Sequence, residues 1–306
     1  MQPIHWFPGH MAKARREMAE SIARVDAVVE VLDARIPHAS ANPMLQSLIG
    51  RKPKVVVLTR ADLADPTQTA GWETHLRREG HQVVTLDART GRGVQRVLPA
   101  LEAVASEKRA KDAKRGIRPR PLKVMVVGIP NVGKSSLINR LAGRSATNVG
   151  DRPGITKMQQ WIRLGQVELL DTPGVLWPKL EEEHVAHTLA ITGAIKSEIL
   201  DKESLFAYFA VWCSTHYPRL LADRYGVPVL PETAWSGVAE VWDAVEPLLA
   251  AIGRQRGLMQ SGGVVDTGRA AELVLRELQT GKLGRVTLEW APTSAAWEND
   301  QPERDE

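Results

Sequence analysis

The stretch GIPNVGKSS, at residues 128–136, has glycines, a lysine and two serines at the spacing of a phosphate-binding loop. It matches the pattern G-x-x-x-x-G-K-[ST], and the apolar run KVMVVG leads directly into it. Gly128 and Gly133 allow the backbone to wrap an anion closely, and the amides that begin the following helix face that anion. We therefore expect Lys134 to reach the β- and γ-phosphates of a nucleoside triphosphate and the Ser135 hydroxyl to ligate Mg²⁺.

A second pattern, LLDTPG at residues 169–174, supplies the metal side of such a site. Asp171 ends an apolar run and is placed to hold Mg²⁺ through its water shell, while Gly174 can offer its backbone N–H to a γ-phosphate. Between the two patterns lies DRPGITK (151–157), where Thr156 can bring its hydroxyl and carbonyl oxygens to Mg²⁺ and the γ-phosphate. A D-x-x-G pattern is weak alone but strong soon after a phosphate-binding loop.

Guanine recognition normally needs an aspartate that binds both the ring N1 and the exocyclic amine. This aspartate is usually the last residue of an N-K-x-D pattern. No such pattern follows Gly174, but LTRADL occurs earlier, at residues 58–63. Asp62 supplies the carboxylate, and the aliphatic stem of Arg60 can lie along a purine as a lysine would. Thr59 stands where asparagine is usual, and its shorter side chain carries a hydroxyl that can tie this loop to the phosphate-binding loop.

A further loop, LDARTGRG at residues 86–93, resembles the S-A-K turn whose backbone amide reads the guanine O6. Asp87 replaces the serine, and Ala88 and Arg89 keep the pattern. The residues expected to contact the nucleotide are therefore Thr59, Arg60, Asp62, Asp87, Ala88, Arg89, Asn131, Val132, Gly133, Lys134, Ser135, Ser136 and Gly174.

Along the chain, the two base-binding patterns come first, followed by the phosphate-binding loop, the loop with Thr156 and the metal-binding pattern. This order is a circular permutation of the usual one. A sheet tolerates this because strand pairing depends on neighbours in space. Apolar runs at 26–34, 54–59, 81–88, 123–128 and 166–174 predict strands that alternate with helical patterns, the first of them at 10–24. We predict an α/β fold: a circularly permuted P-loop GTPase domain with a mainly parallel sheet over residues 1–178.

From about residue 180 helical patterns dominate, which predicts a smaller all-helical domain over 179–292 and a disordered acidic tail over 293–306. No apolar run in the 306 residues approaches the roughly 18 that a membrane span needs. The single cysteine, Cys213, excludes an intrachain disulfide. We expect a cytoplasmic protein with no membrane partner.

The net charge of +4 is unevenly distributed along the chain. Residues 298–306 hold five acids and one arginine, whereas residues 106–123, SEKRAKDAKRGIRPRPLK, hold eight basic and two acidic residues. Such a basic segment suggests a phosphate-rich partner, although charged runs are usually solvated linkers.

With the permuted order, the stretches FPGHMAKA, DARIPHASANP, GIPNVGKSS, RPGITK and DTPGVLWP resemble the ribosome biogenesis GTPase A family over residues 4–290. The stretch GRAAELVLRELQTGKLGRVTLE (268–289) resembles that family's C-terminal RNA-binding helical domain. The resemblance implies a GTPase that binds GTP, GDP and Mg²⁺ and acts late in assembly of the large (50S) ribosomal subunit, with that subunit and its rRNA as partners. We expect a monomer without an obligate protein partner.

The residue after D-x-x-G is Val175, which can neither donate nor accept a hydrogen bond to an attacking water. The resemblance implies an apolar residue there and a catalytic role for His10, on the Pro-Gly turn of FPGHMAKA, alongside Lys134 and Thr156. The alternative for His10 is an ordinary surface histidine at a helix start. Asn131 matches the asparagine that helps to hold K⁺ in potassium-dependent GTPases.

Two other functions remain consistent with these patterns. One is a GTPase switch that acts on a protein or membrane partner through its helical domain, which sedimentation with ribosomal subunits would distinguish. The other is an ATP-using P-loop enzyme such as a small-molecule kinase, against which Asp62 argues.

Overall fold

The computed structural model describes residues 8–143, 160–172, 174, 176, 182–195, 201–231 and 238–292. The chain divides into two compact units, one made of residues 1–179 with 289–306 and the other of residues 180–288. Among the described residues, no helix is both long and apolar enough to cross a bilayer.

The first unit is built on a sheet whose described strands follow the order β3-β2-β1-β4-β6-β5. Neighbouring strands run parallel except β5 and β6, which are antiparallel. The strands are β1 (Ala27–Asp33), β2 (Lys54–Thr59), β3 (Gln82–Thr85), β4 (Leu122–Val127), β5 (Gln160–Leu164) and β6 (Val167–Asp171). The predicted mainly parallel sheet is confirmed, and the predicted runs correspond to all of these strands except β5.

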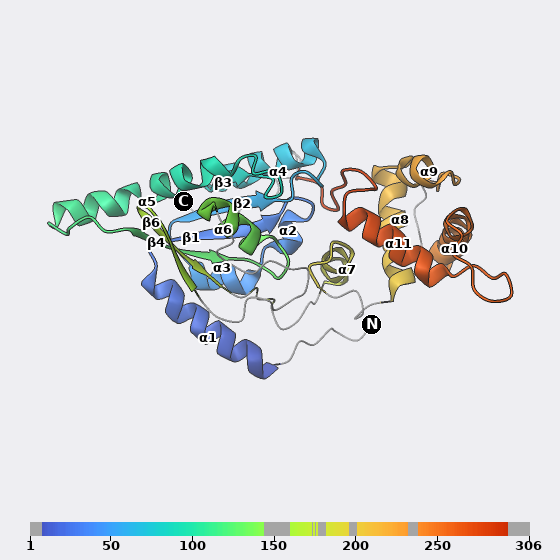
Figure 1. Ribbon diagram of the computed structural model, residues 1–306, viewed down its shortest axis with the longest axis horizontal. Coiled ribbons are helices and arrows are strands. Elements are labelled where there is room, and N and C mark those ends of the chain that lie inside the picture. Colours follow the sequence, from blue (N-terminus) through green and yellow to red (C-terminus); the bar gives the residue numbers. More distant parts are fainter. Residues whose placement is uncertain are drawn as a thin grey trace, which may run out of the picture. The chain divides into compact units, whose positions relative to one another are not determined.

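Helices cover both faces of this sheet (Figure 1). On one face Met18 of α1 (Pro8–Arg24) packs in one cluster with Val28 of β1, and Trp72 of α4 (Pro66–Arg78) packs in another with Leu32 of the same strand. α5 (Val97–Lys114) crosses β1, β2 and β3 on the side away from α1. The remaining elements of this unit are α2 (Pro37–Ser40), α3 (Pro43–Ile49), η1 (Val94–Arg96) and α6 (Lys134–Ala142).

The start of α1 differs from the expected helix at 10–24. The helix begins at Pro8, so His10 lies in its first turn and not on a turn ahead of it. Proline is compatible with this position because its ring fixes φ near the helical value and its missing N–H needs no partner there. The apolar stripe of Met18, Ile22 and Val25 is buried, as its spacing predicts.

The described part of the second unit is helical, as the sequence predicts for this part of the chain. Its helices are α7 (Glu183–Ile191), α8 (Lys202–His216), α9 (Leu220–Tyr225), α10 (Val238–Gln255) and α11 (Thr267–Gln279). α11 packs against α8 and α10, and Phe206 and Phe209 of α8 are fully buried. The carboxylate of Glu277 accepts hydrogen bonds from Arg224 and Tyr225, which fastens α9 to α11.

Residues 289–292 belong to the first unit, where they pack on α2 and α4. The Glu289 carboxylate accepts hydrogen bonds from the backbone N–H groups of His38 and Ala39 at 2.6 and 2.8 Å. The Glu289 carbonyl accepts a third from the Trp72 indole at 2.8 Å. Burial raises the pKa of Glu289 to about 8, although the two N–H donors favour the carboxylate.

Gly71 of α4 makes room for this segment, because a Cβ at Gly71 would lie 2.7 Å from the Ala291 Cβ. Alanine normally stabilises a helix interior by about 0.5–1 kcal/mol over glycine. Here Gly71→Ala should instead detach residues 289–292, since two carbon atoms cannot approach so closely. Hydrogen exchange at the His38 and Ala39 amides should become faster, and the double variant with Ala291→Gly should restore it. Unchanged exchange in Gly71→Ala alone would show that this contact does not hold the segment.

Candidate nucleotide-binding site

The residues expected at the site come together at the carboxyl edge of the parallel strands. Thr59 ends β2, Asp171 ends β6, and the phosphate-binding loop follows β4 at Gly128. This edge is where ligands bind in open parallel sheets. The permuted chain order therefore still brings the base loop, the phosphate-binding loop and the metal side to one edge.

The phosphate-binding loop lies closely against β1. Gly128 has a φ of +153°, and a Cβ there would lie 2.6 Å from the Val31 carbonyl oxygen, so a side chain does not fit. α6 begins directly after the loop, with Ser135 and Ser136 in its first turn. The amides of a first turn have no partner within the helix and form an anion site.

Lys134 lies inside this loop. Its ammonium is buried, and it donates hydrogen bonds to the carbonyls of Gly128 and Ile129 at 3.1 and 2.8 Å. Burial lowers the pKa of Lys134 to about 8, and the nearby Asp171 acts in the opposite direction. The ammonium is thus positioned to neutralise phosphate charge where the loop amides would bind it.

Asp171 is the carboxylate on the metal side. It is 1% exposed, and neither carboxylate oxygen has a hydrogen-bond partner among the described residues. Burial raises its pKa, while Lys134 acts to lower it. Together with the Ser135 hydroxyl at the start of α6, a buried carboxylate with unused oxygens fits a hard cation such as Mg²⁺.

Gly174 lies against the phosphate-binding loop. A Cβ at Gly174 would lie 2.6 Å from the Pro130 Cα and 2.9 Å from the Lys134 Nζ, so only glycine fits. The buried Thr172 hydroxyl donates to the Val126 carbonyl at 2.6 Å and fixes the residue that follows Asp171 to β4. No sequence pattern had singled out Thr172.

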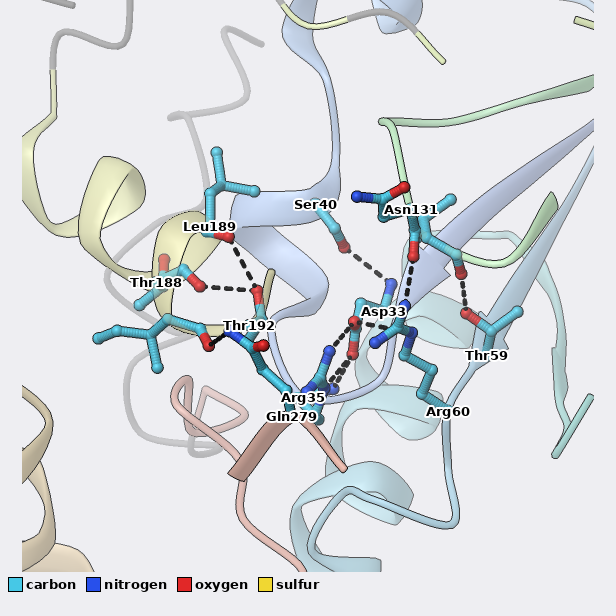
Figure 2. A network of polar contacts seen from close by, with 12 residues as sticks. Asp33, Arg35, Ser40, Thr59, Arg60, Asn131, Thr188, Leu189, Thr192 and Gln279 are labelled. Atoms are coloured by element: carbon cyan, nitrogen blue, oxygen red, sulfur yellow. Dashed lines mark hydrogen bonds and ion pairs between the residues drawn. The ribbon is translucent and has the colours of Figure 1, made fainter. Parts of the chain in front are cut away.

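Two contacts fasten the base loop to the phosphate-binding loop (Figure 2). The Thr59 hydroxyl lies 2.6 Å from the Val132 carbonyl oxygen and 3.0 Å from that of Leu32. The Arg60 guanidinium donates to the Asn131 carbonyl at 2.5 Å, with φ at +56° for Arg60 and +54° for Asn131. Thr59 therefore ties the loops together as expected, and the Arg60 head group also faces the phosphate-binding loop.

Asp33 and Arg35 form a buried ion pair next to Arg60 (Figure 2). Asp33 accepts hydrogen bonds from the Arg35 backbone N, Nε and Nη2 at 3.0, 3.0 and 2.7 Å, and the Arg60 Nε is 3.7 Å from Asp33 Oδ2. Burial alone would raise the pKa of Asp33, but Arg35 and Arg60 hold it below the ordinary value. Asp33 and Arg35 belong to DARIPHASANP, a stretch whose structural role the sequence did not indicate.

The second base loop is shaped by its own side chains. Asp87 accepts hydrogen bonds from the Arg89 backbone N–H at 2.7 Å and from the Thr90 hydroxyl at 2.5 Å. Arg140 of α6 donates to the carbonyls of Ala88, at 2.8 Å, and Arg89. The Asp87 carboxylate thus forms the turn, and the Ala88 amide is the group expected to read the guanine O6.

Asp62 lies beside this second loop, where the Arg89 Nε is 3.4 Å from Asp62 Oδ2. The Arg89 side chain is 78% exposed, and exposed ion pairs of this kind contribute little. A guanine edge can therefore replace Arg89 at the Asp62 carboxylate. Thr156 and Val175 lie outside the described residues, and the His10 side chain is not among those described.

Fold and site together define a circularly permuted P-loop nucleotide-binding protein. Residues 123–203 match the family model described as a 50S ribosome-binding GTPase. The chain is 46% identical to Ribosome biogenesis GTPase A of Bacillus cereus, covering 94% of this chain and 93% of that protein. It is 35% identical to Mitochondrial ribosome-associated GTPase 1 of Bos taurus, covering 93% and 88%. The GNP-bound YlqF from T. maritima matches with a TM-score of 0.62 and 29% identity, covering 91% and 98%.

The chain belongs to the ribosome biogenesis GTPase A family. The family and the circularly permuted P-loop GTPase fold predicted from the sequence are confirmed, as is GTP hydrolysis.

Asp62→Asn should weaken GTP binding and improve binding of xanthosine triphosphate, because an amide matches the altered base edge. A bidentate contact to a base contributes about 1–3 kcal/mol, so the loss should be roughly 5- to 150-fold. Binding of both nucleotides is measured by calorimetry. Asp65→Asn is the matched control, since the Asp65 side chain caps α4 and asparagine caps a helix equally well. An Asp62→Asn variant that binds GTP like the unchanged chain would show that this loop does not read the base.

Proposed function

We propose that this GTPase acts in the cytoplasm, late in the assembly of the large (50S) ribosomal subunit, and contacts its rRNA. The observation that carries the proposal is the family match, because relatives are named for ribosome biogenesis and the matching family model for 50S binding. The basic segment 106–123 adds support, since much of it is the folded end of α5. The helical unit 180–288, within the expected domain 179–292, would supply further RNA contacts.

For hydrolysis, Mg²⁺ would be held by Asp171, Ser135 and Thr156, and it would supply positive charge to the phosphate oxygens. The unpartnered oxygens of Asp171 support this assignment. Lys134 would neutralise the β- and γ-phosphates, and the Gly174 N–H would bind the γ-phosphate. Asn131 would help to hold K⁺, which adds positive charge near the phosphates.

The attacking water needs a polar partner, because Val175 cannot orient it. His10 is the proposed catalytic residue. It lies in the first turn of α1, and histidine is the side chain that most often orients or deprotonates an attacking water.

Single-turnover GTP hydrolysis with and without purified large subunits tests this function. Large subunits should raise the rate of the unchanged chain, and His10→Ala should lose about 10²-fold of the stimulated rate. GTP binding and association with the subunit should persist, because the phosphate and base contacts come from other residues. His184→Ala, at an exposed histidine of α7, is the matched control. The rate should also be higher in potassium than in sodium, and Asn131→Ala should remove that difference.

A chain that large subunits do not stimulate, but that a protein or a membrane does, would contradict the ribosomal function. Full stimulation of His10→Ala would instead return His10 to an ordinary surface histidine. Equal rates in the two salts would remove the role of Asn131.

A further inference from the structure

The turn that connects α5 to β4 is built around a buried carboxylate. Asp26, just before β1, accepts hydrogen bonds from the Lys123 backbone N–H at 3.0 Å and from the Arg120 guanidinium at 2.7 and 2.8 Å, and it also pairs with Lys108. Burial would raise the pKa of Asp26, but Arg120 and Lys108 outweigh it and hold the pKa at about 2. Residues 108–123, called the elbow below, therefore have a defined shape and are not a loose linker.

The elbow encloses a cavity of about 250 Å³ with an excess of positive charge. Four cationic side chains line it, from Lys108, Arg109, Arg118 and Arg120, against the carboxylates of Asp26 and Asp112. Asp26 already pairs with Lys108 and Arg120, and Arg109 pairs with Glu102 at 3.2 Å, whereas Arg118 and Lys114 of the elbow are exposed. α5 carries this basic end out beyond the sheet (Figure 1). Cationic side chains around a cavity at the end of a projecting helix can bind the phosphates of a nucleic-acid backbone.

An exposed aromatic ring lies on the edge strand near the elbow. Trp161 of β5 is 45% exposed, and the Lys123 Nζ is 5.4 Å from its ring centroid. Arg163 points to the same face two residues along, and Glu168 lies in register between Arg163 and Lys123 on the neighbouring strand. An exposed indole with cations beside it is a stacking surface for a nucleic-acid base.

These two features lie on opposite faces of the sheet at the start of β4. Leu122 lines the cavity on the face of α5, whereas the next residue, Lys123, points to the other face and reaches the Trp161 ring. An RNA strand that contacts both would pass around the amino end of β4. This is the amino end of β1 and β4, whereas the phosphate-binding loop lies at their carboxyl end. A ligand at the elbow would therefore share no residue with the nucleotide site.

We propose that the elbow and Trp161 form a binding site for unpaired RNA, with backbone phosphates at the elbow cations and a base stacked on the Trp161 ring. Only the source of this RNA, an exposed rRNA segment of the assembling subunit, rests on the function proposed above.

The test measures binding of the GDP-loaded full chain to a labelled unstructured RNA oligonucleotide and to inorganic polyphosphate, which has no bases. The pair Lys114→Glu with Arg118→Glu should weaken both ligands at least tenfold and make RNA binding less steeply dependent on salt. The control pair Arg77→Glu with Arg78→Glu, at two exposed arginines of α4 in the same unit, should change affinity less than about twofold. GDP affinity should be unchanged in both pairs, which confirms that they fold.

Trp161→Ala should lose about tenfold in RNA affinity and nothing in polyphosphate affinity, and Trp161→Phe should retain most of the RNA affinity. Equal losses of RNA affinity in the elbow variant pair and the control variant pair would overturn the proposal. So would a Trp161→Ala variant that loses RNA and polyphosphate alike, because a structural role would then explain the effect. Subunit-stimulated turnover, measured in parallel, separates the two proposals: its absence in the unchanged chain would contradict the ribosomal function, whereas the RNA measurements decide the elbow site.

Discussion

The Thr59 hydroxyl, between the carbonyl oxygens of Leu32 and Val132, is the contact on which the geometry of the nucleotide site depends. It joins the end of β2, where the base loop begins, to the phosphate-binding loop after β4. It also contacts the end of β1, which lies between them in the sheet. Threonine is short for this task compared with asparagine. It suffices because the two loops lie close together, so that a Cβ at Gly133 would be in van der Waals contact with Thr59 at 3.6 Å. The departure from the usual base pattern is thus matched by a close approach of the two loops.

The charges in the first unit fall into two kinds. Asp33 is a closed pair, since Arg35 satisfies it and Arg60 lies nearby, and removing one partner of such a buried pair typically costs about 3–5 kcal/mol. Asp171 is different, because its oxygens have no hydrogen-bond partner among the described residues while Lys134 is occupied by loop carbonyls. The closed pair holds the base loop in place, and the open carboxylate is left for the ligand.

The sequence predicted those parts of the structure that depend on local patterns. The phosphate-binding loop, the order of motifs and the buried parallel strands follow from glycine spacing and continuous apolar runs. β5, Gln160–Leu164, was missed because it is a short antiparallel edge strand in which exposed and buried residues alternate, without a long apolar run. The contacts of Asp33 and Glu289 were missed because they depend on residues brought together by the fold, with Glu289 and Ala39 separated by 250 positions. Asp26 carries no motif either, although it gives the basic segment its shape.

The Thr59 hydroxyl fastens the base loop to the phosphate-binding loop. The most direct test is the GDP dissociation constant of Thr59→Val, which keeps the shape and removes the hydroxyl, beside Thr59→Ser, which keeps the hydroxyl. Leaving a buried carbonyl without its partner costs about 1–3 kcal/mol, so Thr59→Val should bind GDP roughly 5- to 150-fold more weakly, while Thr59→Ser stays close to the unchanged chain. Equal GDP affinity in Thr59→Val and the unchanged chain would show that this hydroxyl does not hold the two loops together.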